Sequence, residues 1–172
     1  MVRLIGVVVV AGAVAAGCAT MMAGGPSATA VLEATKGNTA GGSVNFVQKG
    51  DKVIVTARVA GLTAGSHGFH IHDKGDCSSG DGMSAGGHFN PLAKPHASPA
   101  TADRHAGDMP MLVADASGDA TLTVELDVIA IGAGATDIVG RSVIVHKDPD
   151  DFKTQPTGNS GARVACGVIR KN

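Results

Sequence analysis

The sequence predicts an all-β domain, an antiparallel sandwich or barrel interrupted by two long loops. Three observations indicate this fold. The chain contains short runs rich in β-branched residues, turn residues separate these runs, and glycine occurs 25 times in 172 residues without a repeating period. There is no Trp or Tyr and there are only four Phe, so the core has to be built from Val, Ile, Leu and Ala.

The chain begins with a predicted targeting segment, residues 1–17. Arg3 is followed by an unbroken apolar run that ends at Ala16, which is too short to span a bilayer and is typical of a secretory signal. The next residues, Gly17 and Cys18, complete a sequence that resembles a bacterial lipobox, in which the cysteine is lipid-modified and becomes the first mature residue. Ordinary cleavage near residues 13–16, which would leave Cys18 as a free thiol, is the alternative.

Residues 18–27 are small, contain Gly and Pro and have no period, so we predict a flexible tether before a domain of residues 28–172. In that domain, eight short runs bounded by turn residues predict strands. In chain order they are Thr29–Ala34, Ser43–Gln48, Lys52–Val59, Gly68–His72, Met111–Asp115, Ala120–Val128, Arg141–His146 and Val164–Ile169.

Two stretches between these runs break the pattern. Residues 73–110 and 147–163 are long, rich in Gly, Pro, Asp and His, and have no strand periodicity. Loops of this length in a compact domain are usually functional. We therefore expect the chemistry of the protein to lie there.

Five of the seven histidines fall between residues 67 and 96. In His70-Ile71-His72, residues i and i+2 of a strand project from one face about 6.6 Å apart, so both imidazoles can converge on one ion. His146, at the end of an apolar strand, could complete a copper site from across the sheet, because Cu(II) favours imidazoles in a tetragonal arrangement. For an isolated His-x-His, two exposed strand histidines are the alternative.

The first long loop carries a second cluster of candidate ligands. It offers three imidazoles and one carboxylate, from His88, His96, His105 and Asp108. Three nitrogens and one oxygen suit a four-coordinate zinc with no open position, which is the structural type of zinc site. His96 or Asp108 alone would be read as a solvated loop residue, and it is the combination of the four side chains that indicates a metal.

Five segments, in the same order, resemble the copper/zinc superoxide dismutases. They are residues 68–72 (GFHIH), 84–91 (SAGGHFNP), 104–108 (RHAGD), 140–146 (GRSVIVH) and 158–169 (GNSGARVACGVI). The likeness runs from about residue 28 to residue 169, nearly all of the mature chain. It implies a flattened Greek-key barrel with two metal-binding loops. It also implies an antioxidant enzyme that converts superoxide to oxygen and hydrogen peroxide.

The resemblance also assigns ligands to a copper and a zinc. It implies that copper is held by His70, His72, His88 and His146, and zinc by His88, His96, His105 and Asp108. His88 belongs to both sets, which requires an imidazolate coordinated through both ring nitrogens. The copper changes oxidation state during turnover, whereas zinc has no redox chemistry and holds the site.

Three further side chains receive roles from the same resemblance. Asp150 matches a carboxylate that joins His70 to His96 by accepting from their remote ring nitrogens, which fixes tautomer and orientation. His67 matches a structural histidine, not a ligand. Arg163 matches an arginine beside the copper, where a guanidinium would attract a small anion such as superoxide.

Cys77 and Cys166 match the internal disulfide of the family, and a bridge can persist in the oxidising compartment to which a signal would direct the chain. We expect a periplasmic or cell-envelope protein that meets the membrane only through a lipid on Cys18. The formal charge of −1 gives no general attraction for nucleic acid. A homodimer is compatible with the sequence, but residues 78–83 lengthen a loop that often contributes to the dimer surface.

Two other kinds of protein could use the same fold. One is an envelope buffer for copper or zinc without turnover, which would not need Arg163 beside an open metal position. The other is an adhesive lipoprotein, which would leave the histidines at ligand spacing unexplained.

Overall fold

The computed structural model describes Met1 and residues 24–172. Residues 2–17 of the predicted signal, Cys18 and most of the predicted tether lie outside the described residues. The first strand begins at Ser27, so the predicted tether extends one residue too far. In the part of the chain that is described, no helix has the length and apolar character needed to cross a membrane.

The described residues form strands and one short 3₁₀ helix, which confirms the all-β prediction. The elements, in chain order, are β1 (Ser27–Ala34), β2 (Gly41–Lys49), β3 (Lys52–Ala60), β4 (Gly65–His67), β5 (Phe69–His72), η1 (Met83–Ala85), β6 (Leu112–Ala114), β7 (Ala120–Leu126), β8 (Ser142–His146) and β9 (Arg163–Lys171).

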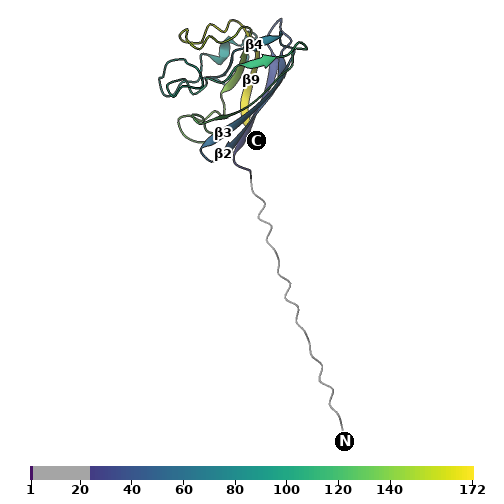
Figure 1. Ribbon diagram of the computed structural model, residues 1–172, viewed down its shortest axis with the longest axis vertical. Helices are drawn as coiled ribbons and strands as arrows, with labels where there is room; N and C mark the ends of the chain where they lie inside the picture. The colour runs from purple at the N-terminus through teal and green to yellow at the C-terminus, as the bar shows by residue number, and fades with distance from the viewer. Residues whose placement is uncertain (2–23) are drawn as a thin grey trace.

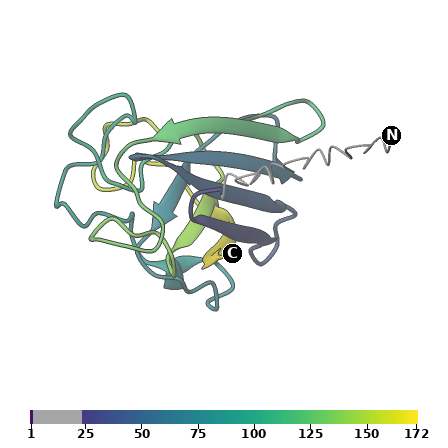
Figure 2. The ribbon, with the colours of Figure 1, turned by 90° about the horizontal axis from the view of Figure 1, so that it is seen from below.

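Seven of the strands form one curled sheet in the order β5-β8-β9-β1-β2-β3-β7, and β4 and β6 form a separate pair. Every pair of neighbouring strands is antiparallel. The sheet bends around a single main core (Figures 1 and 2). This curl and order agree with the predicted Greek-key barrel.

The apolar pattern of β3 shows why the sheet has one buried face. Val53, Val55, Ala57 and Val59 are buried, and the residues between them are exposed or only partly buried. Side chains alternate across a strand, so this period of two places every second residue in the core.

The structure differs from the predicted strands at the shortest elements. Residues 65–67 form β4, a segment that lies between two predicted strands, and they pair with β6 outside the main sheet. Residues 83–85 form η1 inside a predicted loop. Both elements are three residues long, so tertiary contacts and not local periodicity define them. Arg163, predicted at the end of a loop, is the first residue of β9.

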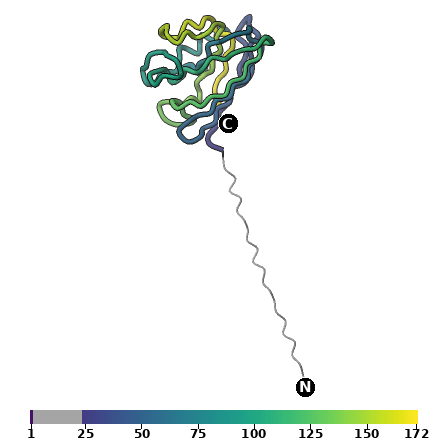
Figure 3. The backbone as a smooth tube through the Cα atoms, viewed as in Figure 1, coloured from purple at the N-terminus to yellow at the C-terminus, as the bar shows by residue number. Residues whose placement is uncertain are grey.

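The two long loops, residues 73–110 and 147–162, lie side by side at one end of the curled sheet (Figure 3). The first loop returns to the free edge of β5, where its main chain continues the sheet. Phe89 N–H donates to the carbonyl of Ile71, and Ile71 N–H donates to the carbonyl of Gly107. At Gly107 a side chain would collide with the Ile71 carbonyl, so only glycine allows this close approach.

Candidate metal centre

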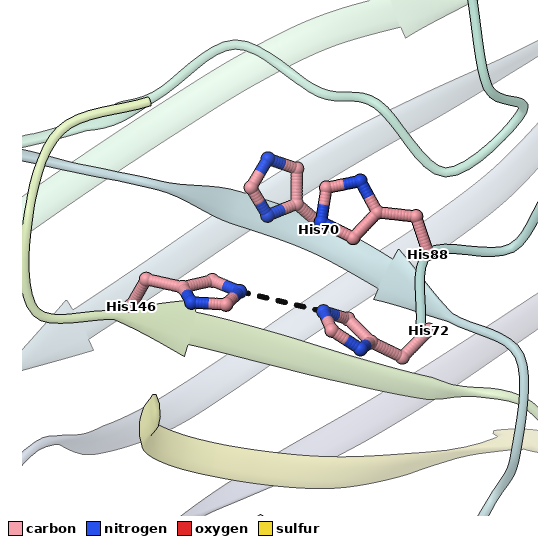
Figure 4. Close-up of side chains that lie close together, drawn as sticks. All are labelled: His70, His72, His88 and His146. Carbon is pink, nitrogen blue, oxygen red and sulfur yellow. Dashed lines mark hydrogen bonds between the residues drawn. The ribbon is translucent and has the colours of Figure 1, made fainter. Parts of the chain in front are cut away.

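Two strands and one irregularity position the first set of histidines. His70 and His72 lie on one face of β5, which pairs with β8 so that His70 lies opposite Ile144. The pairing of β8 with β9 shifts register between Val145 and His146. Such a bulge re-aims a side chain, and here it directs His146 toward the β5 histidines (Figure 4).

The return of the first loop to β5 brings the second set beside the first. His88 forms an isolated bridge with His72, and Asp108 forms one with His70. The sheet edge therefore fixes where a histidine and a carboxylate of the loop enter the site, although the loop has no strand of its own.

The four histidines of the first cluster, His70, His72, His88 and His146, offer ring nitrogens that all lie within 4.8 Å of one another, and all four residues are buried. His72 Nδ1 donates to the carbonyl of Gly86 at 2.9 Å, which leaves its Nε2 facing His146 Nε2 at 3.4 Å. His70 Nδ1 is buried and has no hydrogen-bond partner among the described residues. These inward nitrogens leave room for one ion that accepts imidazole ligands.

His88 faces two clusters at once. Its ring stacks on the ring of His70 with centroids 3.9 Å apart. Its Nε2 is buried, and no group in residues 24–172 forms a hydrogen bond with it. Its Nδ1 lies 3.0 Å from Asp108 Oδ1 and 3.4 Å from His105 Nδ1. One imidazole thus presents each ring nitrogen to a different set of ligands.

The second cluster has the dimensions of a tetrahedral zinc site. Nδ1 of His88, His96 and His105 lies 3.0, 2.9 and 3.4 Å from Asp108 Oδ1. Ligands about 2.0–2.1 Å from one zinc are separated by about 3.3 Å along a tetrahedral edge. Asp108 Oδ2 accepts from the N–H groups of Ala97 and His105, which leaves Oδ1 to face the three nitrogens. The residues present therefore fit zinc.

Asp150 connects the two clusters. Its Oδ2 lies 2.7 Å from His70 Nε2 and its Oδ1 lies 2.9 Å from His96 Nε2, and all three side chains are fully buried. Phe152 N–H also donates to Oδ1. The carboxylate orients both rings so that their Nδ1 atoms point to the clusters. At Gly158 a side chain would collide with Asp150, so a glycine leaves room for this bridge.

Burial sets the protonation of the first cluster. It lowers the pKa of His88 to about 4 and that of His146 to about 3, and it lowers the pKa of His70 and His72 as well. All four rings are therefore neutral near pH 7, the form that binds a metal.

The second cluster behaves differently because His96 contacts two carboxylates, Asp108 within the cluster and Asp150 beside it. Burial acts to lower the pKa of His96, but the hydrogen bonds that its ring donates to the carboxylates of Asp108 and Asp150 outweigh burial and raise that pKa to about 9. For Asp108, burial acts to raise the pKa, and hydrogen bonds with His105, His88 and His96 hold it well below its usual range. A cation bound among these groups would stabilise the negative charge of Asp108, as the histidine protons do in its absence.

Arg163 lies beside the first cluster and is half-buried. Burial lowers its pKa from the ordinary value. Both of its terminal nitrogens donate at 2.6 Å, one to the carbonyl of Gly82 and the other to that of Gly86. Gly86 also accepts from His72, so the guanidinium and a cluster histidine share one carbonyl. Arg163 therefore holds this loop in addition to offering positive charge, a role that the sequence had not indicated.

The remaining predicted residues have clear positions. His67 is buried outside both clusters, with ring nitrogens 2.8 Å from the carbonyl oxygens of His146 and Thr63. Cys77 and Cys166 form a disulfide that ties the first long loop to β9. Cys166 lies three positions after Arg163, so the disulfide and the guanidinium hold the same loop from the same strand.

Two contributions were not predicted from the sequence. The carbonyl of Gly86 serves both Arg163 and His72, and a main-chain acceptor leaves no side-chain signal. The side-chain amide of Gln155 binds the main chain of His96 on both sides. A single glutamine in a polar loop has no spacing pattern that could have identified it.

Residues 40–169 match the family model described as copper/zinc superoxide dismutase. The chain is 42% identical over 134 residues to an extracellular superoxide dismutase [Cu-Zn] of Caenorhabditis elegans, covering 74% of this chain and 60% of that protein. It is 44% identical over 147 residues to superoxide dismutase [Cu-Zn] 2 of Brassica juncea, covering 81% of this chain and 94% of that protein.

A solved structure shows the same arrangement. The crystal structure of the clock protein EA4 superposes with a TM-score of 0.77 at 40% sequence identity, covering 84% of this chain and 93% of that one. The predicted fold is therefore confirmed over nearly the whole described chain.

Proposed function

The chain belongs to the copper/zinc superoxide dismutase family, and from this premise we propose that its two joined clusters dismutate superoxide. The observation that carries the proposal is His88, whose two ring nitrogens face two different buried ligand sets. A protein that only stored metal would not need one imidazole shared between two ions.

In this proposal His70, His72, His88 and His146 hold copper, and His88, His96, His105 and Asp108 hold zinc. The first set offers imidazole nitrogens alone, which suits copper, and the second offers three nitrogens and a carboxylate oxygen, which suits zinc. When bound, copper supplies one-electron redox chemistry, and zinc supplies positive charge and fixed geometry.

The residues of this chain deliver protons to the reaction and attract the superoxide anion. Two superoxide anions and two protons give one dioxygen and one hydrogen peroxide, so the site has to deliver protons. His88 Nε2 is buried beside the first cluster and has no hydrogen-bond partner in residues 24–172, so it is free to hold a proton there and pass it to the substrate. We assign His88 the roles of bridge and proton carrier.

Arg163 attracts the anion. Its two terminal nitrogens are fixed on the carbonyls of Gly82 and Gly86, so the positive group keeps one orientation beside the first cluster. A fixed charge needs no reorganisation when superoxide arrives. Asp150 orients His70 and His96, and a ring nitrogen of His67 binds the main-chain carbonyl of His146 itself.

We further propose that the protein is exported and that Cys18 carries a lipid in the cell envelope. The apolar start of the sequence, the lipobox-like residues and the disulfide support export. A relative named as extracellular fits the same compartment. Mass spectrometry of Cys18 and of a Cys18→Ser variant distinguishes a lipid anchor from free secretion.

One purified sample of the mature protein tests the enzymatic proposal. Bound copper and zinc are measured together with the rate of superoxide consumption. We expect one copper and one zinc per chain and rapid turnover. Metal binding at this stoichiometry without superoxide consumption would instead identify a metal buffer.

A further inference from the structure

The side chain of Gln155 forms two hydrogen bonds with the main chain of His96, one of the candidate zinc ligands. Gln155 Oε1 accepts from the N–H of His96 at 2.8 Å, and Gln155 Nε2 donates to the carbonyl of His96 at 2.7 Å. The amide therefore satisfies both polar main-chain groups of one buried residue, as a neighbouring strand would.

His96 needs such support because its segment belongs to no helix or strand. Its ring is already held by Asp108 at Nδ1 and by Asp150 at Nε2. These contacts orient the ring, but they do not fix the main chain from which the ring extends. Gln155 supplies that constraint from the second long loop, residues 147–162, which also carries Asp150.

Only some residue types could form this pair of hydrogen bonds. An amide offers a donor and an acceptor on one planar group, whereas a carboxylate at pH 7 offers only acceptors. Asparagine carries the same amide on a side chain shorter by one methylene. Gln155 itself is exposed, so replacing it opens no cavity in the core.

We propose that Gln155 is a positioning residue that holds His96 ready to bind zinc. The proposal rests on the assignment of His96 to the zinc set. Gln155 acts through His96 and touches neither the metal nor the substrate. Loss of its two hydrogen bonds should allow the His96 segment to move, so that zinc binds more weakly and in a less regular geometry.

The test uses the full mature chain prepared without metals. Zinc affinity is measured by competition with a chromophoric chelator, and the site geometry is measured by the visible absorption of Co(II) loaded in place of zinc. The variants are Gln155→Ala, Gln155→Met, which keeps the length without the hydrogen bonds, and Gln155→Asn. Partners that orient metal ligands contribute about 10–100-fold to affinity, and we expect a loss of about tenfold for Gln155→Ala and Gln155→Met.

Gln48→Ala is the matched control. Gln48 is also a side-chain amide that binds main chain on both sides, donating to the carbonyls of Gly50 and Lys52 and accepting from Ile131 N–H. None of these contacts involves a candidate ligand. We expect Gln48→Ala to keep wild-type zinc affinity and the wild-type Co(II) spectrum, even where it lowers the melting temperature.

The outcomes distinguish an error about the role of Gln155 from an error about the zinc ligands. The proposal is supported if Gln155→Ala and Gln155→Met bind zinc more weakly and change the Co(II) spectrum while Gln48→Ala changes neither. Gln155→Asn, whose shorter side chain does not place the amide against His96, should also bind zinc more weakly than wild type. Wild-type zinc affinity in Gln155→Met would overturn the proposal while leaving the zinc site intact. Failure of the wild-type chain to bind zinc would instead overturn the assignment of the zinc ligands.

Discussion

The curled sheet buries very different residues toward its two ends. One region, called here the β2–β3 end, lies next to the edge strand β7, and the other, the β5–β8 end, includes the edge strand β5. In β2 and β3 buried and exposed positions alternate, and the buried side chains are Val, Ala and Phe. In β5 and β8 every residue is buried, histidines included. The loops that cover β5 add further buried histidines and the buried carboxylates of Asp108 and Asp150.

The difference shows that the fold uses two sources of stability. The β2–β3 end is stabilised by apolar burial, which requires no ligand. The β5–β8 end buries polar groups, which is costly unless each group has a partner. Its histidines and carboxylates satisfy one another, and the two buried imidazole nitrogens without a partner among the described residues, His70 Nδ1 and His88 Nε2, face the first cluster. Substitutions at the two ends should therefore differ in kind.

Removing one ligand from each cluster should have the largest effect on activity. We expect His146→Ala to lose copper and nearly all superoxide consumption, because it removes one of four inward nitrogens, and to keep most of its zinc. Asp108→Ala should lose zinc and become less stable. Metal analysis and superoxide kinetics on both variants check this, and full copper and activity in His146→Ala would show that the copper assignment is wrong.

A matched pair of phenylalanines tests the two sources of stability directly. Phe46 in β2 and Phe89 beside His88 are both almost fully buried. Truncation to alanine should cost about 3–5 kcal/mol of unfolding free energy at either site. Only Phe89→Ala should also weaken metal binding, because the cavity left by its ring allows the segment that carries His88, and that pairs with Ile71 and Gly107, to shift. Denaturant unfolding of the metal-free proteins and metal titration separate the two effects, and equal metal affinities would contradict the comparison.

Loss of the disulfide should have a somewhat smaller effect on stability. Replacing both Cys77 and Cys166 by serine should cost about 2–5 kcal/mol, the usual range for a native bridge in a small secreted domain. The loop that carries Gly82 and Gly86 would lose its tie to β9, so the anchor of Arg163 should loosen as well. Thermal unfolding with and without a reductant measures the cost. Peptide mapping that joined Cys77 to Cys18 would contradict the pairing.

Substitution of Arg163 should have the smallest effect on stability and a clear effect on rate. We expect Arg163→Ala to slow the reaction with superoxide about tenfold, at the low end of the range for electrostatic steering. The difference should shrink as salt increases, because the screening length is about 10 Å at 0.1 M and falls above that. Arg163→Lys should keep part of the rate, since it retains the charge but not both hydrogen bonds.

Two results would contradict the proposal that Arg163 attracts superoxide. The first is a rate for Arg163→Ala equal to that of wild type at low ionic strength. The second is a large loss of copper, which would show that the two hydrogen bonds to Gly82 and Gly86 matter more than the charge.

The strands of the β2–β3 end were predictable because their periodicity is local. Lys52–Val59 was predicted, and β3 runs from Lys52 to Ala60. The three-residue elements β4 and η1 were not predictable, since contacts with distant segments define them. The same limit applies to the site. The types and spacing of the histidines indicated two metals, but no sequence pattern shows which ring nitrogen faces inward.

For His72 that choice is made by the carbonyl of Gly86, and for His70 by the carboxylate of Asp150. For His96, the main chain is held by Gln155, which comes from the other long loop. These contacts depend on how the two loops fold onto one another. Predicting them requires the three-dimensional arrangement.

The pairing of the first strand with the last has a consequence for how the protein folds. Ala28 lies opposite Lys171, and β1 separates β9 from β2 in the sheet. The β1–β2–β3 meander can form from neighbouring segments, but the sheet cannot close until β9 is available. Such non-local pairing slows folding. Arg163 and Cys166 lie on β9, so the site can be completed only after this strand has been synthesised and has paired with β1.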